Sequence, residues 1–270
     1  MKTKMAAYPY VLWMALFVVM PIILVVIYAF TNTAGEFTLA NFARMSDYVL
    51  VFRRSMSLAV TATVVCLAVG YPVAYLLAKS GERLRRASMM LIMLPMWINF
   101  LLRTYAWMSI LENTGLINRL LTLLGLPTAR MINTQGAVVL GMVYNYLPFM
   151  ILPIYSVILK IDQSVIEGAQ DLGADALRVF LRVILPLSLS GVISGVTMVF
   201  VPSVSTFIIS KLLGGGTSIL LGDLIEMQFL GNAYNPNLGA AISLIMMVIV
   251  IICMSIMNRF GEGEEQAVIM

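Results

Sequence analysis

The chain has 270 residues, of which 61% are hydrophobic and 11% are charged, with a formal net charge of +4 and a mean hydropathy of +0.96. A soluble domain usually carries about 25% charged residues, so most of this chain needs lipid around it instead of water. The absence of histidine excludes His-based metal sites, general bases and nucleophile pairs, and the basic residues form no separate domain of the kind that binds nucleic acid.

Six apolar segments follow one another along the chain, and each is long enough to cross a bilayer as a helix. Runs of this length favour helices, since a barrel strand needs only about 10 residues. We therefore predict an all-α membrane protein. Its six expected transmembrane helices are Tyr8–Phe30, Ser55–Ala78, Ala87–Leu111, Gln135–Leu159, Pro186–Ser210 and Leu238–Met257.

The charges between these segments predict the orientation. With the N-terminus inside, ten Lys and Arg residues fall on the cytoplasmic side and six on the opposite side, which favours a cytoplasmic N-terminus and C-terminus. We divide the chain into residues 1–54, with the first span and an external loop, residues 55–258, with the other spans and a cytoplasmic loop at 160–186, and a cytoplasmic tail at 259–270. Cys66 and Cys253 lie in apolar stretches and are expected to be buried thiols, with no metal site.

The loop at 160–186 has the pattern of two short helices joined by a turn. Ser164 and Glu167 have the spacing of a capping box, which predicts a helix from Val165. Gly173 permits a positive φ at a turn, and Asp175 can cap a second helix. Three interpretations are open from these residues alone: Glu167 serves only the cap, the segment lies on the lipid surface, or it docks a soluble partner. The acidic residues fit anionic lipid poorly.

This loop resembles the EAA motif of ATP-binding-cassette importer permeases. The matching residues are Glu167-Gly168-Ala169, then Gly173, then Val183-x-Leu185-Pro186. The chain departs from the motif at Gly168, where the family has Ala, and at Val183, where it has Ile. Stretches such as Gly70–Lys79 and Leu147–Tyr155 are similar to the spermidine/putrescine (PotB-type) family of these permeases.

The resemblance implies a type I importer transmembrane domain whose loop forms a coupling helix that inserts into an ATPase subunit. It also implies several partners: a second homologous permease, an ATPase dimer that binds the ATP and magnesium, and an extracytoplasmic polyamine-binding protein. We expect no catalytic residue and no cofactor in this chain, and a location in the bacterial inner membrane. The residues expected to couple to the ATPase are Glu167, Gly168, Ala169, Gly173, Asp175, Leu185 and Pro186.

A polyamine is a flexible polycation, so its path needs acceptor dipoles and aromatic faces that release it again. The residues that we expect along the path are Trp97, Asn99, Tyr144, Asn145, Ser203 and Ser205. Anchoring in the interfacial aromatic belt remains an alternative for the aromatic members of the third and fourth spans. On the external side, Glu112, Asp223 and Glu226 are expected to attract a cation, although solvated loop carboxylates are common.

Three further features of the spans lead to expectations. Arg103 lies about 24 Å along the third helix from Ala87, so we expect it to reach the outer interface by snorkelling. Gly191 and Gly195 give a small-residue face for close packing against another helix, which we assign to the partner permease. Pro202 predicts a kink or local unwinding midway along the fifth span.

Two alternatives in function remain. A permease of the same architecture could carry sulfate, a phosphonate or an amino acid. An ion-coupled secondary transporter would need acidic residues inside the spans, and none of the six predicted segments contains one.

Overall fold

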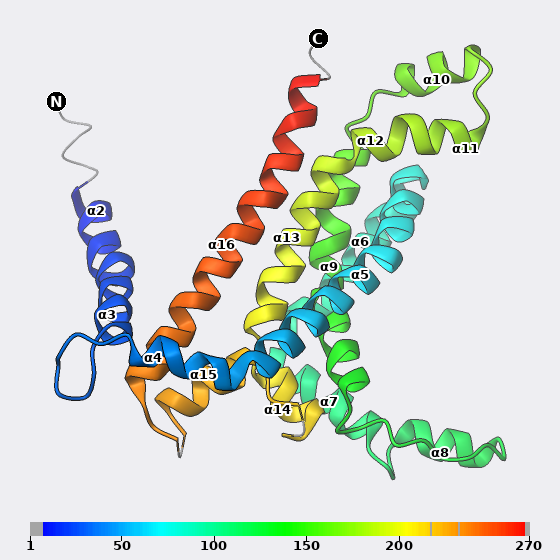
Figure 1. The fold of residues 1–270 in the computed structure, drawn as a ribbon. Coiled ribbons are helices and arrows are strands. Elements are labelled where there is room, and N and C mark those ends of the chain that lie inside the picture. The colour runs from blue at the N-terminus through cyan, green and yellow to red at the C-terminus, as the bar shows by residue number, and fades with distance from the viewer. Residues whose placement is uncertain (1–7, 217, 232, 268–270) are drawn as a thin grey trace.

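The computed structural model describes residues 8–216, 218–231 and 233–267, which form a bundle of long helices with shorter helices at both ends (Figure 1). The first elements are α2 (Tyr8–Met14), the π-helix η1 (Ala15–Val19), α3 (Met20–Ala29), α4 (Ala40–Ala43), the 3₁₀ helix η2 (Arg44–Tyr48) and α5 (Val49–Lys79). Next come α6 (Glu82–Trp97), α7 (Phe100–Leu111), α8 (Leu116–Leu123), α9 (Gln135–Ile158), α10 (Gln163–Asp171), α11 (Ala176–Val179) and the π-helix η3 (Phe180–Ile184). The last are α12 (Leu185–Leu187), α13 (Leu189–Ser205), α14 (Ile208–Gly214), α15 (Leu221–Phe229) and α16 (Pro236–Ala267).

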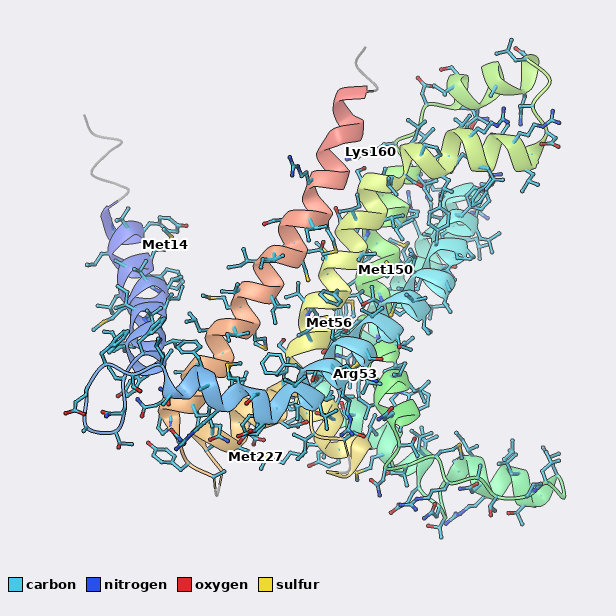
Figure 2. All side chains as sticks on the ribbon, viewed as in Figure 1. Met14, Arg53, Met56, Met150, Lys160 and Met227 are labelled. Carbon is cyan, nitrogen blue, oxygen red and sulfur yellow. The ribbon has the colours of Figure 1, made fainter. Side chains whose placement is uncertain are left out.

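Four helical segments are long and apolar enough to cross a membrane without interruption. They are Pro9–Ala29, Ala40–Lys79, Gln135–Ile158 and Pro236–Met257. Most side chains of α2 and α3 are exposed (Figure 2), and only the end of α3 packs against α16. Such an apolar surface is stable in lipid and would be unstable in water, because each exposed aliphatic side chain would cost about 1.5–3 kcal/mol. The prediction of a helical membrane protein is confirmed.

The third predicted span is not one helix. It is divided into α6 and α7, and the combined segment Glu82–Trp97 plus Phe100–Leu123 bends by 94°. Pro95, near the end of α6, lacks a backbone N–H, and the Asn99 side chain accepts a hydrogen bond from the Leu101 N–H at 2.9 Å and caps α7. Proline and asparagine together therefore end one helix and start another inside an apolar stretch.

The fifth predicted span is also interrupted, but at its ends. Residues Ala176–Leu187 and Leu189–Ser205 meet at an angle of 61°, and α13 ends at Ser205, three residues after Pro202. The expected kink or local unwinding is found inside the predicted span, but later than Pro202. The helix continues through Pro202 and unwinds only at Thr206, where α14 starts after a two-residue break.

The centre of the bundle is formed by α5, α9 and α13, which pack on one another along their lengths. Met150 of α9 lies where these helices meet (Figure 2): a Cβ added at Gly70 would be 2.9 Å from its Cγ, and one at Gly195 would be 2.9 Å from its sulfur. Gly191 approaches the backbone of α9 just as closely. The expected close packing of this small-residue face of α13 is confirmed, but its partner is α9 of the same chain and not a second permease.

The ends of the bundle differ in character. The start of α2, the end of α16 and the segment from α10 to α12 lie toward one end, and α4, α8, α14 and α15 lie toward the other (Figure 1).

The carbonyl groups where the first span ends are bound by two asparagine side chains. The amide groups of Asn41 and Asn237 both donate hydrogen bonds to Thr31 O, just beyond the span, at 3.0 and 2.8 Å. The predicted division after Arg54 falls inside α5, and α16 continues through the division at Arg259.

Candidate functional site

The segment from α10 to α12 (residues 163–187), which we call the helical hairpin, projects from the bundle end that carries the start of α2 and the end of α16 (Figure 1). Its first helix begins earlier than predicted. Asp162 caps α10, and its carboxylate accepts a hydrogen bond from the Ser164 N–H at 3.0 Å. This hydrogen bond also lowers the pKa of Asp162 below its ordinary value. The predicted capping box of Ser164 and Glu167 is wrong, because Asp162 occupies the cap position two residues before Ser164.

The turn of the helical hairpin depends on Gly173. Its φ is +82°, its N–H donates to Gln170 O at 2.8 Å, and the next N–H, of Ala174, donates to Ala169 O at 3.1 Å. These two bonds form a Schellman motif, in which a residue in the left-handed region ends a helix. Only glycine adopts that region without a steric cost. The observed φ confirms the positive value predicted for Gly173 from the sequence.

The second helix of the hairpin starts as predicted. The Asp175 carboxylate accepts a hydrogen bond from the Arg178 N–H at 2.8 Å and caps α11. The chain then continues through the π-helix η3 into α12, where Leu185 is half-buried and Pro186 lies in the first turn. Proline is accepted there because the first N–H groups of a helix have no intrahelical partner.

The outward face of the helical hairpin is free. Glu167 is exposed and, among the described residues, makes no hydrogen bond or ion pair, and a Cβ added at Gly168 would meet nothing within 4 Å. Leu172 is 91% exposed and Leu177 is 65% exposed, next to the turn. A large aliphatic side chain held in water at a rigid turn is typical of a surface that another protein covers.

The inward face of the helical hairpin packs against the bundle. Ala169 is half-buried and lies in the core cluster formed by α5, α9 and α13. Phe180 meets the rings of Tyr71 and Tyr75 of α5 edge-on, with centroids 5.8 and 5.1 Å apart. The seven predicted coupling residues therefore have different positions: Glu167 and Gly168 face outward, Ala169 and Leu185 face the bundle, Gly173 and Asp175 shape the turn, and Pro186 lies in the first turn of α12.

The six predicted path residues come from three regions of the bundle. Trp97 and Asn99 lie at the break between α6 and α7, Tyr144 and Asn145 are near the middle of α9, and Ser203 and Ser205 are in the last turn of α13. The hydroxyl group of Ser203 donates to Val199 O at 2.7 Å, and the amide of Asn145 donates to Gly141 O at 2.8 Å. Both donors therefore bond to carbonyl groups of their own helices, whereas the Asn145 Oδ1 atom is buried and has no hydrogen-bond partner among the described residues. The path remains a prediction.

Arg103 lies on α7, after the break in the third predicted span. Because α7 starts only after the 94° bend, a straight rise from Ala87 does not apply. The Nε and Nη1 atoms of Arg103 are buried and have no hydrogen-bond partner among the described residues. Two of its three guanidinium nitrogens are thus shielded from the surroundings, and snorkelling remains a prediction.

Two of the three predicted external carboxylates already interact with other groups of the chain. Glu226 pairs with the Lys211 ammonium group at 2.8 Å, and Asp223 is 8% exposed and accepts a hydrogen bond from the Leu220 N–H at 2.8 Å, which starts α15. The Glu112 side chain is exposed and makes no contact of this kind within the described ranges. Attraction of a cation by these three residues remains a prediction, and Glu112 has the carboxylate that is free to do so.

Burial raises the pKa of the Asp223 carboxyl above its ordinary value. An acid whose pKa is higher in the folded chain binds its proton more tightly there, so stability falls as the pH rises from about 4 through the raised pKa. We expect the thermal midpoint of the purified chain to fall over this pH range, and Asp223→Asn to reduce the fall. Glu112→Gln is the matched control and should leave it unchanged. Equal pH profiles for wild type and Asp223→Asn would contradict this assignment.

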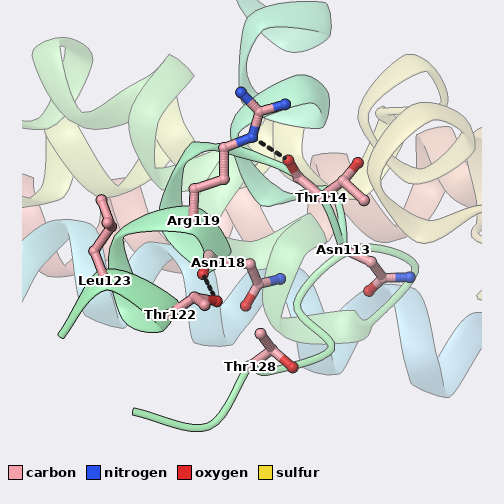
Figure 3. Close-up of a pocket in the computed structure, with 7 residues that line it drawn as sticks. All are labelled: Asn113, Thr114, Asn118, Arg119, Thr122, Leu123 and Thr128. Atoms are coloured by element: carbon pink, nitrogen blue, oxygen red, sulfur yellow. Dashed lines mark hydrogen bonds between the residues drawn. The ribbon is translucent and has the colours of Figure 1, made fainter. Parts of the chain in front are cut away.

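An open hollow of about 610 Å³ lies beside α8 (Figure 3), at the end of the bundle opposite the helical hairpin (Figure 1). Asn118 is buried beside it and holds the segment that follows α8. Its amide group donates a hydrogen bond to Ala129 O at 3.0 Å, and its amide oxygen accepts one from the Ala129 N–H at 2.9 Å. Arg119 points upward along the hollow and donates to Thr114 O at 3.0 Å. The lining contains one cation and no carboxylate, so it is poorly suited to a polycation.

Sequence reasoning missed the contacts between the helical hairpin and α5. Tyr71 and Tyr75 are four residues apart at the end of the second span, which places both rings on one face of a helix. That spacing was available in the sequence, but nothing in it identifies Phe180 as the ring that they contact.

Comparison with known proteins places this arrangement in a family. Residues 70–262 match the family described as the inner membrane component of binding-protein-dependent transport systems. The chain is 37% identical over 247 residues to the spermidine/putrescine transport system permease protein PotB of Escherichia coli K12, covering 88% of this chain and 90% of that protein. It is 28% identical over 250 residues to the inner membrane ABC transporter permease protein YdcU of the same organism, covering 86% and 79%.

Solved structures agree in fold. A chain of a bacterial ABC transporter that imports the acidic polysaccharide alginate superposes with a TM-score of 0.83 at 15% identity, covering 96% of this chain and 94% of that one. A chain of the MetNI methionine ABC transporter gives a TM-score of 0.61 at 18% identity, covering 82% and 98%. The fold is that of the transmembrane domain of type I ABC importers, and the chain belongs to the family of inner membrane components of binding-protein-dependent transport systems.

Proposed function

We propose that this chain is a permease subunit of an ATP-driven importer of spermidine and putrescine. In this proposal it forms half of the translocation pathway, with a second homologous permease forming the other half. The observation that carries the proposal is the helical hairpin, whose rigid turn presents Glu167 and an exposed leucine to a partner. The polyamine cargo is supported by the identity of 37% to PotB over most of both chains.

The subunit itself catalyses nothing in this proposal. ATP and magnesium are bound by two ATPase subunits, since the glycine run Gly214–Gly216 lacks the Gly-Lys-Ser/Thr ending of a phosphate-binding loop. Closure of the ATPase dimer pushes on the helical hairpin, and this push opens the bundle toward the side from which the binding protein delivers its cargo.

The proposed orientation places the helical hairpin, the start of α2 and the end of α16 at the cytoplasmic face of the bacterial inner membrane. It is supported by the excess of Lys and Arg in the segments at this end, including Arg83, Arg85 and Arg86 beside α5. The extracytoplasmic binding protein then docks at the end that carries α8, α14 and α15.

The test is uptake by the complete transporter in proteoliposomes, with this chain, the second permease, the ATPase and the binding protein. We expect labelled spermidine or putrescine to accumulate only when ATP is on the ATPase side. Sulfate, a phosphonate and amino acids serve as competing cargoes, and their uptake in place of a polyamine would contradict the cargo. Uptake by this chain without an ATPase would contradict the ABC mechanism.

A further inference from the structure

The direction of the helical hairpin relative to α13 is set by one residue. Ser188 lies at the 61° bend between α12 and α13, with φ −93° and ψ 1°, and its side chain is fully buried. Its N–H donates to Ile184 O at 2.9 Å, which closes the last turn before the bend. Any rotation of the helical hairpin against α13 therefore changes the backbone at Ser188.

The Ser188 hydroxyl group is tied to α5. It donates to Leu185 O at 3.1 Å, and the Tyr71 hydroxyl oxygen lies 2.7 Å from it. A serine hydroxyl has one proton to donate. Because Ser188 donates it to Leu185 O, the Tyr71 hydroxyl is the donor in the second hydrogen bond and the Ser188 oxygen is the acceptor. Tyr71 is 8% exposed and Ser188 is fully buried. Hydrogen bonds in such surroundings are strong, and a buried hydroxyl that loses its partner is destabilised.

Tyr71 also holds the helical hairpin through its ring. Phe180 packs edge-on against it, at an interplanar angle of 84°, and against Tyr75 one turn further along α5. The Lys79 ammonium group lies 4.4 Å from the centroid of Tyr75, another turn along. One face of α5 thus receives the helical hairpin, and Tyr71 contacts both η3 and the hinge residue.

On the other side of the hinge, α13 and α9 are closely interlocked. Gly191 and Gly195 bring α13 so close to α9 that an added Cβ would lie 2.9 Å from Pro153 O or from the Met150 sulfur. At the far end of α13, the Thr206 side chain faces that of Tyr146 on α9. Interlocked backbones of this kind do not slide past one another easily. The bend at Ser188 is the break in the helical path between the helical hairpin and this interlocked pair.

We infer that Tyr71 is a positioning residue whose hydroxyl group locks the Ser188 hinge, so that movement of the helical hairpin is passed to α5 and α13 and is not lost as bending. This inference rests on the proposed function, because it assigns a residue to the step in which ATPase movement reaches the transmembrane helices. With the lock removed, the helical hairpin still binds its partner through Glu167 and its exposed leucines, but its movement is partly absorbed at the hinge.

The test measures ATP hydrolysis and labelled spermidine uptake in the same reconstituted complex. For Tyr71→Phe, which keeps the ring against Phe180, we expect uptake per ATP hydrolysed to fall about tenfold, the equivalent of one buried hydrogen bond of about 1.4 kcal/mol, with hydrolysis itself changed less than about twofold. Ser188→Ala should give the same fall. The double variant should be no worse than either single variant, because both remove one interaction.

The controls remove hydroxyl groups that make no hydrogen bond within the described ranges. Tyr155→Phe on α9 and Ser190→Ala on α13 should keep the wild-type ratio of uptake to hydrolysis. An unchanged ratio in Tyr71→Phe, or single effects that multiply in the double variant, would overturn the inference. A fall in the ratio that Tyr155→Phe shares would overturn it as well, since a general loss of packing would then suffice.

A second measurement tests the hinge independently of which solute the transporter carries. Spin labels on cysteines at Gln163 in α10 and at Leu76, which is 66% exposed on α5, report their separation with and without ATP, after the native cysteines are replaced by alanine. In wild type we expect one distance to convert to another on ATP binding, and in Tyr71→Phe we expect a broad distribution in both states. Equal distributions for the two proteins would overturn the inference. Absence of polyamine uptake by wild type with these distances as expected would contradict only the proposed cargo.

Discussion

Glu167→Lys should abolish ATP-driven uptake while the chain still inserts in the membrane and keeps its fold. The carboxylate of Glu167 is exposed and makes no hydrogen bond or ion pair with the described part of the chain, and the cap of α10 is supplied by Asp162. Its replacement therefore removes nothing that holds the helical hairpin together. At a buried interface, removal of one partner of a charged hydrogen bond costs roughly 2–5 kcal/mol, which is sufficient to release the ATPase.

The measurement pairs uptake with retention of the ATPase on the purified membrane complex. We expect both to fall by more than about thirtyfold for Glu167→Lys, and by less for Glu167→Gln, which keeps the shape of the side chain and removes only its charge. Glu82→Lys is the matched control, because Glu82 is an exposed acid at the same end of the bundle whose contact with Arg86 is a surface ion pair. Normal uptake by Glu167→Lys with the ATPase still bound would contradict the docking role.

The helical hairpin shows how much of this site can be predicted from the sequence. The existence of the helical hairpin, the turn at Gly173 and the cap at Asp175 each depend on residues within about four positions of one another, so local rules predict them. Local rules also offer more than one candidate for a cap. Asp162 and Ser164 both precede α10, and only the course of the chain as it leaves α9 decides between them.

The long-range contacts could not be predicted in the same way. Tyr71 and Ser188 are 117 positions apart in the sequence, and their hydrogen bond depends on how α5 and α13 cross. The 94° bend was missed for a different reason: hydropathy continues through Ile98, and the breaking signals of Pro95 and Asn99 are four residues apart in a stretch that otherwise reads as one span. Burial of Asp223 follows from packing around α15, which hydropathy alone does not report.

Gly173→Leu should also abolish coupled uptake, through the backbone and not through charge. At φ +82° a residue with a Cβ costs about 1–2 kcal/mol, and relief of that strain requires the loss of the two hydrogen bonds that end α10. The outward face of α10 then no longer has a fixed direction relative to α11, so Glu167 and Leu172 are presented wrongly to a partner. We expect uptake to fall by more than about tenfold, with normal insertion in the membrane.

Gly168→Ala is the control that isolates this cause, since both glycines lie in α10 or its cap and both are exposed. A Cβ at Gly168 meets no atom within 4 Å, and alanine in place of glycine stabilises a helix by about 0.8–1 kcal/mol. We therefore expect full uptake and a slightly higher thermal midpoint for Gly168→Ala. If the two variants lost uptake equally, side-chain bulk on the docking face would explain both results, and the turn at Gly173 would have no separate role. Gly173→Asn provides a graded case, because asparagine enters the left-handed region more easily than leucine, and uptake between that of wild type and Gly173→Leu would place the cause in the backbone.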